Sequence, residues 1–189
     1  MSRLPQVVLV AATLVACWLG MQAVHEAGHV LGAWLTGGRV SSVVLHPLTI
    51  SRTDLVENPH PLLVVWAGPV FGVLAPLLLW AVVAVGRLPA AFLARFFAGF
   101  CLIANGAYIG CGEFGRIGDC GVMLSWGSSP WQLWLFGAMT IPLGLWLWHR
   151  QAPHFGFGVA GTQVSKSAVW VAVVVSLGLV ALGLLIDGR

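Results

Sequence analysis

Long apolar stretches separated by short polar segments dominate this chain of 189 residues. A helix that crosses a membrane needs about 20 mostly apolar residues. Pro61 and Pro89 stand where two such stretches begin, a position at which the missing N–H of proline costs nothing. The pattern predicts an all-α membrane protein with about five transmembrane helices, at residues 5–35, 61–85, 89–111, 131–148 and 168–186.

The segment that follows the first predicted helix has a different pattern. Residues 40–45 and 48–52 are rich in β-branched side chains, and His46-Pro47 separates them. Such a pattern predicts two short strands, that is, a β-hairpin, with an irregular or re-entrant loop as the alternative. The edge of a strand here could hold an extended peptide by main-chain hydrogen bonds. A simple cap over a site in the membrane is the other interpretation.

Composition supports the membrane assignment. Apolar residues make up 59% of the chain and charged residues only 8%, whereas soluble domains carry roughly 25% charged residues. The nine basic residues form no run, so we expect a lipid bilayer as the surroundings and no nucleic-acid partner. We expect one integral membrane domain over residues 1–189, with a core at about 5–125 and two further helices at 131–148 and 168–186.

Membrane orientation is almost undetermined by charge. Five spans place the termini on opposite faces, and the positive-inside rule then compares the basic residues of the two faces. We expect a multi-pass protein of a bacterial cell membrane, with a slight lean towards a cytoplasmic N-terminus. The two sets are Arg3, Arg87, Arg95, Arg150 and Lys166 on one face and Arg39, Arg52, Arg116 and Arg189 on the other.

One motif near the end of the first predicted helix contains residues that can bind a metal ion. His25 and His29 are four positions apart, so on a helix they share a face with their Cβ atoms about 5–6 Å apart. Two imidazoles at this spacing can bind one zinc ion, and Glu26 can take a proton from a water held at the metal. Because ionisable side chains are costly inside a membrane helix, such a cluster indicates function.

A zinc site of this kind needs a third protein ligand. The metzincin pattern would place a histidine at the position of Leu35, so that class is excluded. We favour Asp119, because the small residues around it permit a tight, non-helical backbone, which membranes tolerate where it lines a cavity. Glu113 is the next candidate. All the candidates on this face are His46, Asp54, Glu57, His60, Glu113, Asp119 and Cys120.

These features together resemble the site-2 protease family of intramembrane zinc metalloproteases, with this chain as a short member. The resemblance covers about residues 20–125. It rests on the motif His25-Glu26-Ala27-Gly28-His29, on Ala67-Gly68-Pro69 in the next helix, and on Asn105 and Asp119 around the end of the one after.

The resemblance implies a role for each matching residue. His25, His29 and Asp119 would hold one Zn²⁺ per chain, and Glu26 would be the general base. Asn105 would lie near the scissile peptide bond, as a candidate for binding the substrate or the transition state. In the better-known members the zinc lies nearer the cytoplasm, which disagrees with the charge count above. We favour the orientation of the family, because the charge count differs by only one basic residue.

The chain departs from the family pattern after Asn105. The aspartate of the family normally follows the asparagine by eight or nine residues, in a segment that contains proline, and glycine follows it directly. Here Asp119 comes fourteen residues after Asn105, prolines are absent, and Cys120 stands before Gly121. These departures affect the assignment of Asn105 more than that of Asp119.

The sequence thus predicts a zinc metalloendopeptidase of the HExxH type. Its partner would be a membrane-embedded protein substrate, whose peptide bonds it hydrolyses with water activated by zinc and Glu26. The alternative is a non-proteolytic zinc-binding membrane protein, for transport, sensing or assembly. Glu26 argues against the alternative, because metal binding alone does not require a general base.

Overall fold

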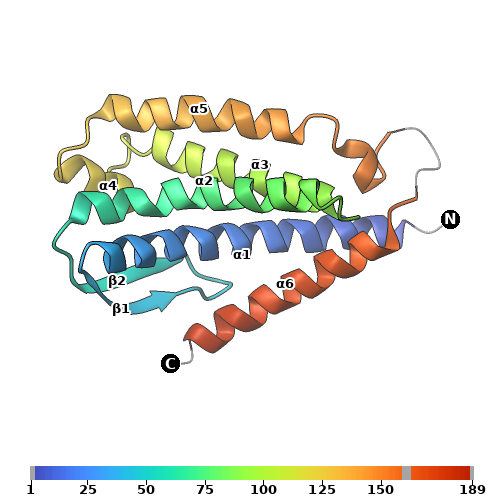
Figure 1. The fold of residues 1–189 in the computed structure, drawn as a ribbon, viewed down its shortest axis with the longest axis horizontal. Coiled ribbons are helices and arrows are strands. Elements are labelled where there is room, and N and C mark those ends of the chain that lie inside the picture. Colours follow the sequence, from blue (N-terminus) through green and yellow to red (C-terminus); the bar gives the residue numbers. More distant parts are fainter. Residues whose placement is uncertain (1–2, 159–162, 188–189) are drawn as a thin grey trace.

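The computed structural model describes residues 3–158 and 163–187 of the chain. All five predicted helices are present, and their ends lie within two residues of the predicted ones (Figure 1). They are α1 (Leu4–Leu35), α2 (Pro61–Val85), α3 (Ala91–Gly110), α5 (Pro130–Trp148) and α6 (Lys166–Asp187).

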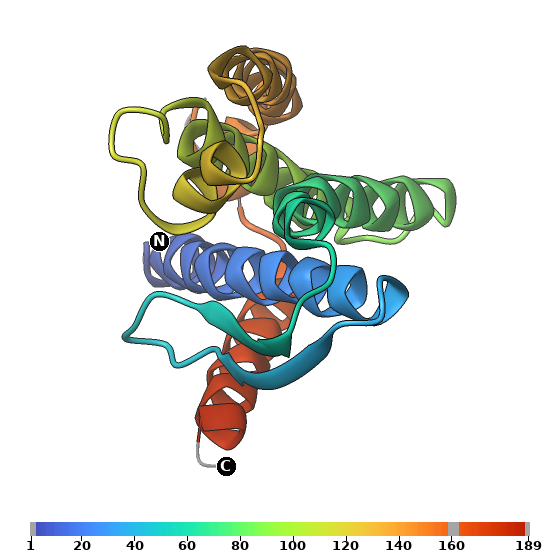
Figure 2. The ribbon, with the colours of Figure 1, turned by 90° about the vertical axis from the view of Figure 1, so that its left-hand side faces the viewer.

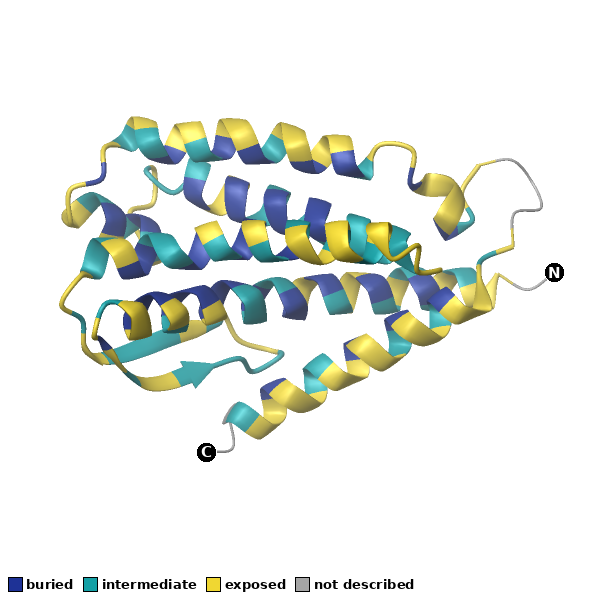
Figure 3. Ribbon diagram, in the orientation of Figure 1, coloured by how far each residue is buried: buried dark blue, intermediate teal, exposed yellow. Residues whose placement is uncertain are grey.

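The surface of the bundle suits a bilayer. Four helices, α1, α2, α3 and α6, are long and apolar enough to cross a membrane by length and composition. Helix α5 is not among these four, because its tryptophans and prolines and Gln132 lower its hydropathy. Large apolar side chains such as Leu78, Met139 and Leu177 are exposed, and exposed positions run along the outer faces of the helices (Figure 3). The prediction of an all-α membrane protein is therefore confirmed.

The helices pack in a simple order. Helix α3 lies against α5 and α2, α2 lies against α1, and α6 crosses the other side of α1 obliquely (Figures 1 and 2). Small residues bring α1 and α2 together: a Cβ added at Gly28 would lie 2.8 Å from the Cβ of Phe71 and 2.9 Å from the Cα of Gly68. This close approach fixes the part of α1 that carries the two histidines against α2.

A two-stranded antiparallel sheet follows α1, made of β1 (Arg39–Val44) and β2 (Arg52–Glu57). The hairpin is confirmed, but the predicted position of its second strand, 48–52, was wrong. Pro47 begins a turn that the N–H of Thr49 closes on the carbonyl of His46. Pairing therefore resumes only at Arg52, opposite Val44. The hairpin lies along the last turns of α1 (Figures 1 and 2).

Two short helices, α4 (Gly118–Ser125) and the 3₁₀ helix η1 (Ala152–Phe155), lie in segments predicted as connections. Helix α4 is held by Cys120 and Met123, which are buried against Val65, Ile109 and Leu133. Eight residues give too short an apolar pattern to be recognised as a helix from sequence. The expected non-helical backbone at Asp119 was therefore wrong, since Asp119 lies in the first turn of α4.

Candidate metal centre

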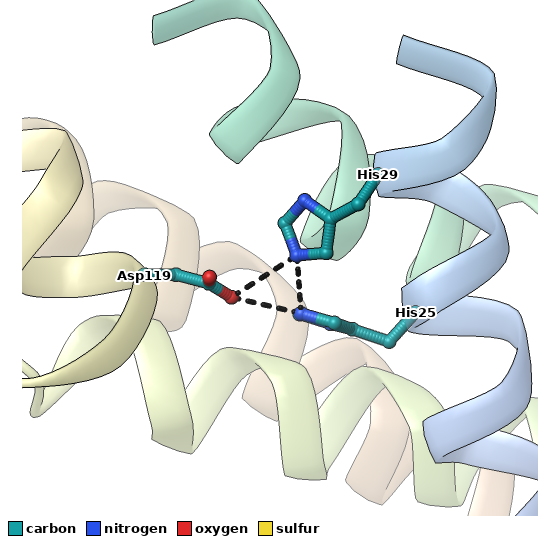
Figure 4. Close-up of side chains that lie close together, drawn as sticks. All are labelled: His25, His29 and Asp119. Atoms are coloured by element: carbon teal, nitrogen blue, oxygen red, sulfur yellow. Dashed lines mark hydrogen bonds and ion pairs between the residues drawn. The ribbon is translucent and has the colours of Figure 1, made fainter. Parts of the chain in front are cut away.

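Three side chains from two separate elements converge beside α2 (Figure 4). His25 and His29 extend from one face of α1, and Asp119 faces them from α4. The Nε2 atom of His25 lies 2.8 Å from Oδ2 of Asp119 and 3.0 Å from Nε2 of His29. The Nε2 atom of His29 lies 3.4 Å from the same carboxylate oxygen. Among the described residues, only this cluster groups potential metal ligands so closely.

The second nitrogen of each imidazole determines which nitrogen carries the hydrogen. Nδ1 of His29 lies 2.9 Å from the main-chain oxygen of Val64, which only accepts. Nδ1 of His25 lies 2.7 Å from Oδ1 of Asn105, whose amide nitrogen donates to the carbonyl of Cys101 at 2.9 Å and so fixes the orientation of the amide. Both Nδ1 atoms therefore donate, and in the neutral imidazoles both Nε2 atoms present lone pairs to the centre of the cluster.

A cation is needed where these atoms meet. Two imidazole lone pairs and a carboxylate oxygen repel one another unless an added proton or a metal ion lies between them. Metal bonds of 2.0–2.2 Å in tetrahedral geometry separate the ligand atoms by about 3.3–3.6 Å. Of the observed separations, 3.4 Å lies in this range, and 2.8 and 3.0 Å lie slightly below it. The residues fit a metal ion with nitrogen and oxygen ligands.

Asp119 is fixed through its backbone as well as its side chain. Its N–H donates to the hydroxyl of Tyr108 on α3 at 3.0 Å. Burial raises the pKa of the Asp119 carboxyl, but hydrogen bonds and positive charge from His25 and His29, when these imidazoles are protonated, outweigh burial and hold the pKa well below its usual range. The side chain is therefore an anion at neutral pH. The next residue, Cys120, is not a member of the cluster, since its thiol lies 3.4 Å from the carbonyl of Tyr108.

Two glycines of α2 make room for this arrangement. A Cβ at Gly68 would collide with the imidazole of His29. A Cβ at Gly72 would lie 2.9 Å from Oδ1 of Asn105, the atom that orients His25. Only a residue without a side chain allows α2 to pass this close to both groups. The sequence Ala67-Gly68-Pro69 thus lies beside the cluster for a steric reason.

Glu26 is buried, with only 3% of its surface exposed, and its carboxylate is bound to the hairpin. The hydroxyl of Ser51 donates to one carboxylate oxygen and the hydroxyl of Thr53 to the other, each at 2.7 Å. One turn earlier on α1, the side-chain oxygen of Gln22 accepts a hydrogen bond from the N–H of Ser51 at 3.0 Å. The segment 51–53 therefore contacts α1 at three points beside the metal cluster.

The structure brings together some of the site residues predicted from the sequence and leaves others apart. His25, His29 and Asp119 come together, and Asn105 contacts His25. The contact of Asn105 is with a histidine, so its role toward substrate stays a prediction. The other ligand candidates of the sequence lie outside the cluster, among them Glu113 in the turn after α3.

Ser51, Thr53 and Tyr108 were missed by the sequence analysis. Tyr108 is the only tyrosine of the chain and stands in an apolar helix, where a hydroxyl that needs a partner is a usable signal. Ser51 and Thr53 are two positions apart and so share one face of an extended segment. Nothing in the sequence says which way that face points.

The family comparison agrees with this geometry. A family model described as Peptidase M50B-like matches residues 6–108, more than half of the chain. The matched segment includes His25, Glu26, His29 and Asn105, whereas Asp119 lies beyond it. No curated protein and no solved structure matches the chain significantly. The chain therefore belongs to the Peptidase M50B-like family, which is the site-2 protease family of membrane metallopeptidases.

Proposed function

We propose that this protein is an intramembrane zinc endopeptidase that hydrolyses peptide bonds of membrane-embedded proteins. One observation carries the proposal: two imidazoles and a carboxylate converge with their lone pairs on one point, and a buried glutamate neighbours the first ligand in sequence. Their buried position supports a reaction within the membrane. His25 lies ten residues before the end of α1, or about 15 Å along the helix axis.

The chain supplies three ligands and a base. His25, His29 and Asp119 would hold the zinc ion, which when bound polarises a peptide carbonyl and lowers the pKa of water. Glu26 accepts a proton from the attacking water and returns it to the amide nitrogen as the C–N bond breaks. The products are a carboxylic acid and an amine, so no other reactant is needed.

The alternative, a non-proteolytic zinc-binding membrane protein, leaves Glu26 without a purpose. A buried carboxylate held by two hydroxyl donors is not needed to retain a metal whose ligands are other residues. The membership in a peptidase family also favours proteolysis over transport or sensing.

We further propose that substrate enters as an extended peptide beside the hairpin, whose strands can pair with it.

Metal content and proteolysis test this proposal directly. We expect about one zinc ion per chain in detergent-purified protein, and cleavage of at least one member of a panel of membrane helices. A chelator should stop cleavage, and added zinc should restore it. Protein that retains one zinc ion per chain but cleaves no member of the panel would favour the non-proteolytic alternative.

The contacts between the hairpin and Glu26 lead to a second prediction. A carboxylate has about four lone-pair positions, so the bonds from Ser51 and Thr53 orient Glu26 and still leave room for water. We expect Thr53→Val, which keeps the shape of the side chain, and Ser51→Ala to lower kcat about tenfold each, since small misplacements of a reacting group cost up to about a hundredfold. KM and zinc content should stay unchanged.

Conservative variants separate positioning from folding. Thr53→Ser and Ser51→Thr keep the hydroxyl donors and should retain most of kcat. Ser42→Ala is the matched control, because Ser42 donates to the exposed Asp54 in the same hairpin and does not contact Glu26. Equal losses in Ser42→Ala and Thr53→Val would show that the hairpin matters only for stability.

A further inference from the structure

A pocket lies at the end of the bundle away from the metal cluster. It has a volume of about 540 Å³, which is in the range of small-molecule sites. Its walls come from α2, the start of α3, η1 and the segment before α6. The described residues of these walls include no acidic side chain; among them are Trp80, Phe92, Arg95, Gln151, His154 and Ser165.

Arg95 supplies the cation of this pocket. Its guanidinium donates to the carbonyls of Trp146 and His149 at the end of α5, both at 3.4 Å, and lies 5.9 Å from the centre of the Trp146 ring. These contacts hold the side chain in place. Its Nε atom is buried and has no hydrogen-bond partner. The guanidinium of Arg95 is therefore held in one orientation, and not all of its N–H groups are used in hydrogen bonds with the described residues.

Gln151 supplies an acceptor without a donor. Only 3% of its surface is exposed, and its amide nitrogen donates to the carbonyl of Leu147 at 3.2 Å. Its Oε1 atom is buried and unpartnered. Buried polar atoms are almost always paired, so this oxygen is open to a donor that the described residues do not supply. A cation and a residue with an unpaired acceptor thus both line the pocket.

The surrounding charges select an anion. Five basic residues lie at this end of the bundle: one before α1, one in the α2–α3 turn, one in the first part of α3, one after α5 and one at the start of α6. All six acidic residues belong to the opposite half (Figure 1). The end therefore has a formal charge of +5 with no acidic residue to offset it. The basic set is Arg3, Arg87, Arg95, Arg150 and Lys166, and the acidic set is Glu26, Asp54, Glu57, Glu113, Asp119 and Asp187.

We propose that this pocket binds the headgroup of an anionic phospholipid that carries a hydroxyl group, of the phosphatidylglycerol type. Arg95 donates to the phosphate, and a headgroup hydroxyl donates to Oε1 of Gln151. A lipid is the fitting source of the phosphate, because the pocket lies where the helices end and aromatic side chains, Trp80 and Phe92, form part of its wall. Basic residues at such an interface attract anionic lipids.

Native mass spectrometry of the detergent-purified full chain tests the proposal. We expect phosphatidylglycerol to bind about tenfold more tightly than phosphatidylcholine, and Arg95→Gln to remove this difference, because charge-assisted hydrogen bonds are the strong ones. Gln151→Leu should weaken phosphatidylglycerol binding but not the binding of phosphatidic acid, which lacks the headgroup hydroxyls. Gln151→Leu also provides a test if Arg95→Gln does not fold.

Matched controls distinguish the pocket from a merely basic surface. Arg87→Gln and Arg150→Gln remove the same charge from the same end outside the pocket, and each should change lipid binding less than about twofold. Equal losses in these variants and in Arg95→Gln would overturn the site. Binding of glycerol 3-phosphate as tight as that of the lipid would overturn the lipid source and assign the pocket to a free phosphate.

Discussion

Glu26→Gln is expected to lower the rate of peptide cleavage by about 10²–10⁴, the usual contribution of general acid–base catalysis. The amide oxygen and nitrogen of glutamine can still form hydrogen bonds with the hydroxyls of Ser51 and Thr53, so the hairpin should stay in place. Zinc content should also stay at the wild-type value, because Glu26 is not one of the converging ligands. Cleavage kinetics and metal analysis on the same preparation provide both measurements.

Glu57→Gln is the matched control for the loss of a carboxylate. Glu57 lies in β2 with its side chain exposed and forms only a distant ion pair with Arg39, at 3.9 Å. Its substitution should leave both cleavage and zinc content unchanged. If Glu26→Gln retained more than about a tenth of the wild-type rate, Glu26 would not be the base, and the proposed reaction would lose its proton acceptor.

The bundle was predictable because hydrocarbon imposes a simple rule. Each long helix needs a long, mostly apolar stretch, and most of the charged residues lie between these stretches. The predicted start of α2 at Pro61 is the observed one. Where apolar length gave no signal, prediction was poorer: β2 begins at Arg52 rather than at Leu48, and α4 was missed.

The site was predictable only where its chemistry is local. His25, Glu26 and His29 lie within one turn and a quarter of a helix, so their spacing alone determines that the two histidines share a face. Asp119 is ninety positions further on. The small residues around it made it the favoured candidate, and the resemblance to a family strengthened that choice. Ser51 and Thr53 reach Glu26 only because Pro47 turns the chain back along α1. That contact depends on tertiary structure, which composition and spacing do not encode.

Removal of the carboxylate ligand is expected to have the second large effect. Asp119→Asn keeps the size of the side chain but replaces its charge, leaving two neutral imidazoles to hold the ion. Changes in groups that only orient metal ligands already cost about 10–100-fold in affinity, so we expect a loss of more than about a hundredfold. Competition with a zinc chelator measures this affinity without any need for proteolysis.

Two further variants, compared with Asp119→Asn, should give a graded loss of zinc affinity. Asn105→Leu removes the acceptor that orients His25, at 2.7 Å, but no ligand, and should weaken zinc binding by about 10–100-fold. Glu113→Gln changes a carboxylate that lies outside the cluster and should have no effect. The expected loss of affinity therefore decreases from Asp119→Asn through Asn105→Leu to Glu113→Gln. If Glu113→Gln removed the zinc while Asp119→Asn kept it, the third ligand would be Glu113, and α4 would have to move away from the two histidines when the ion binds.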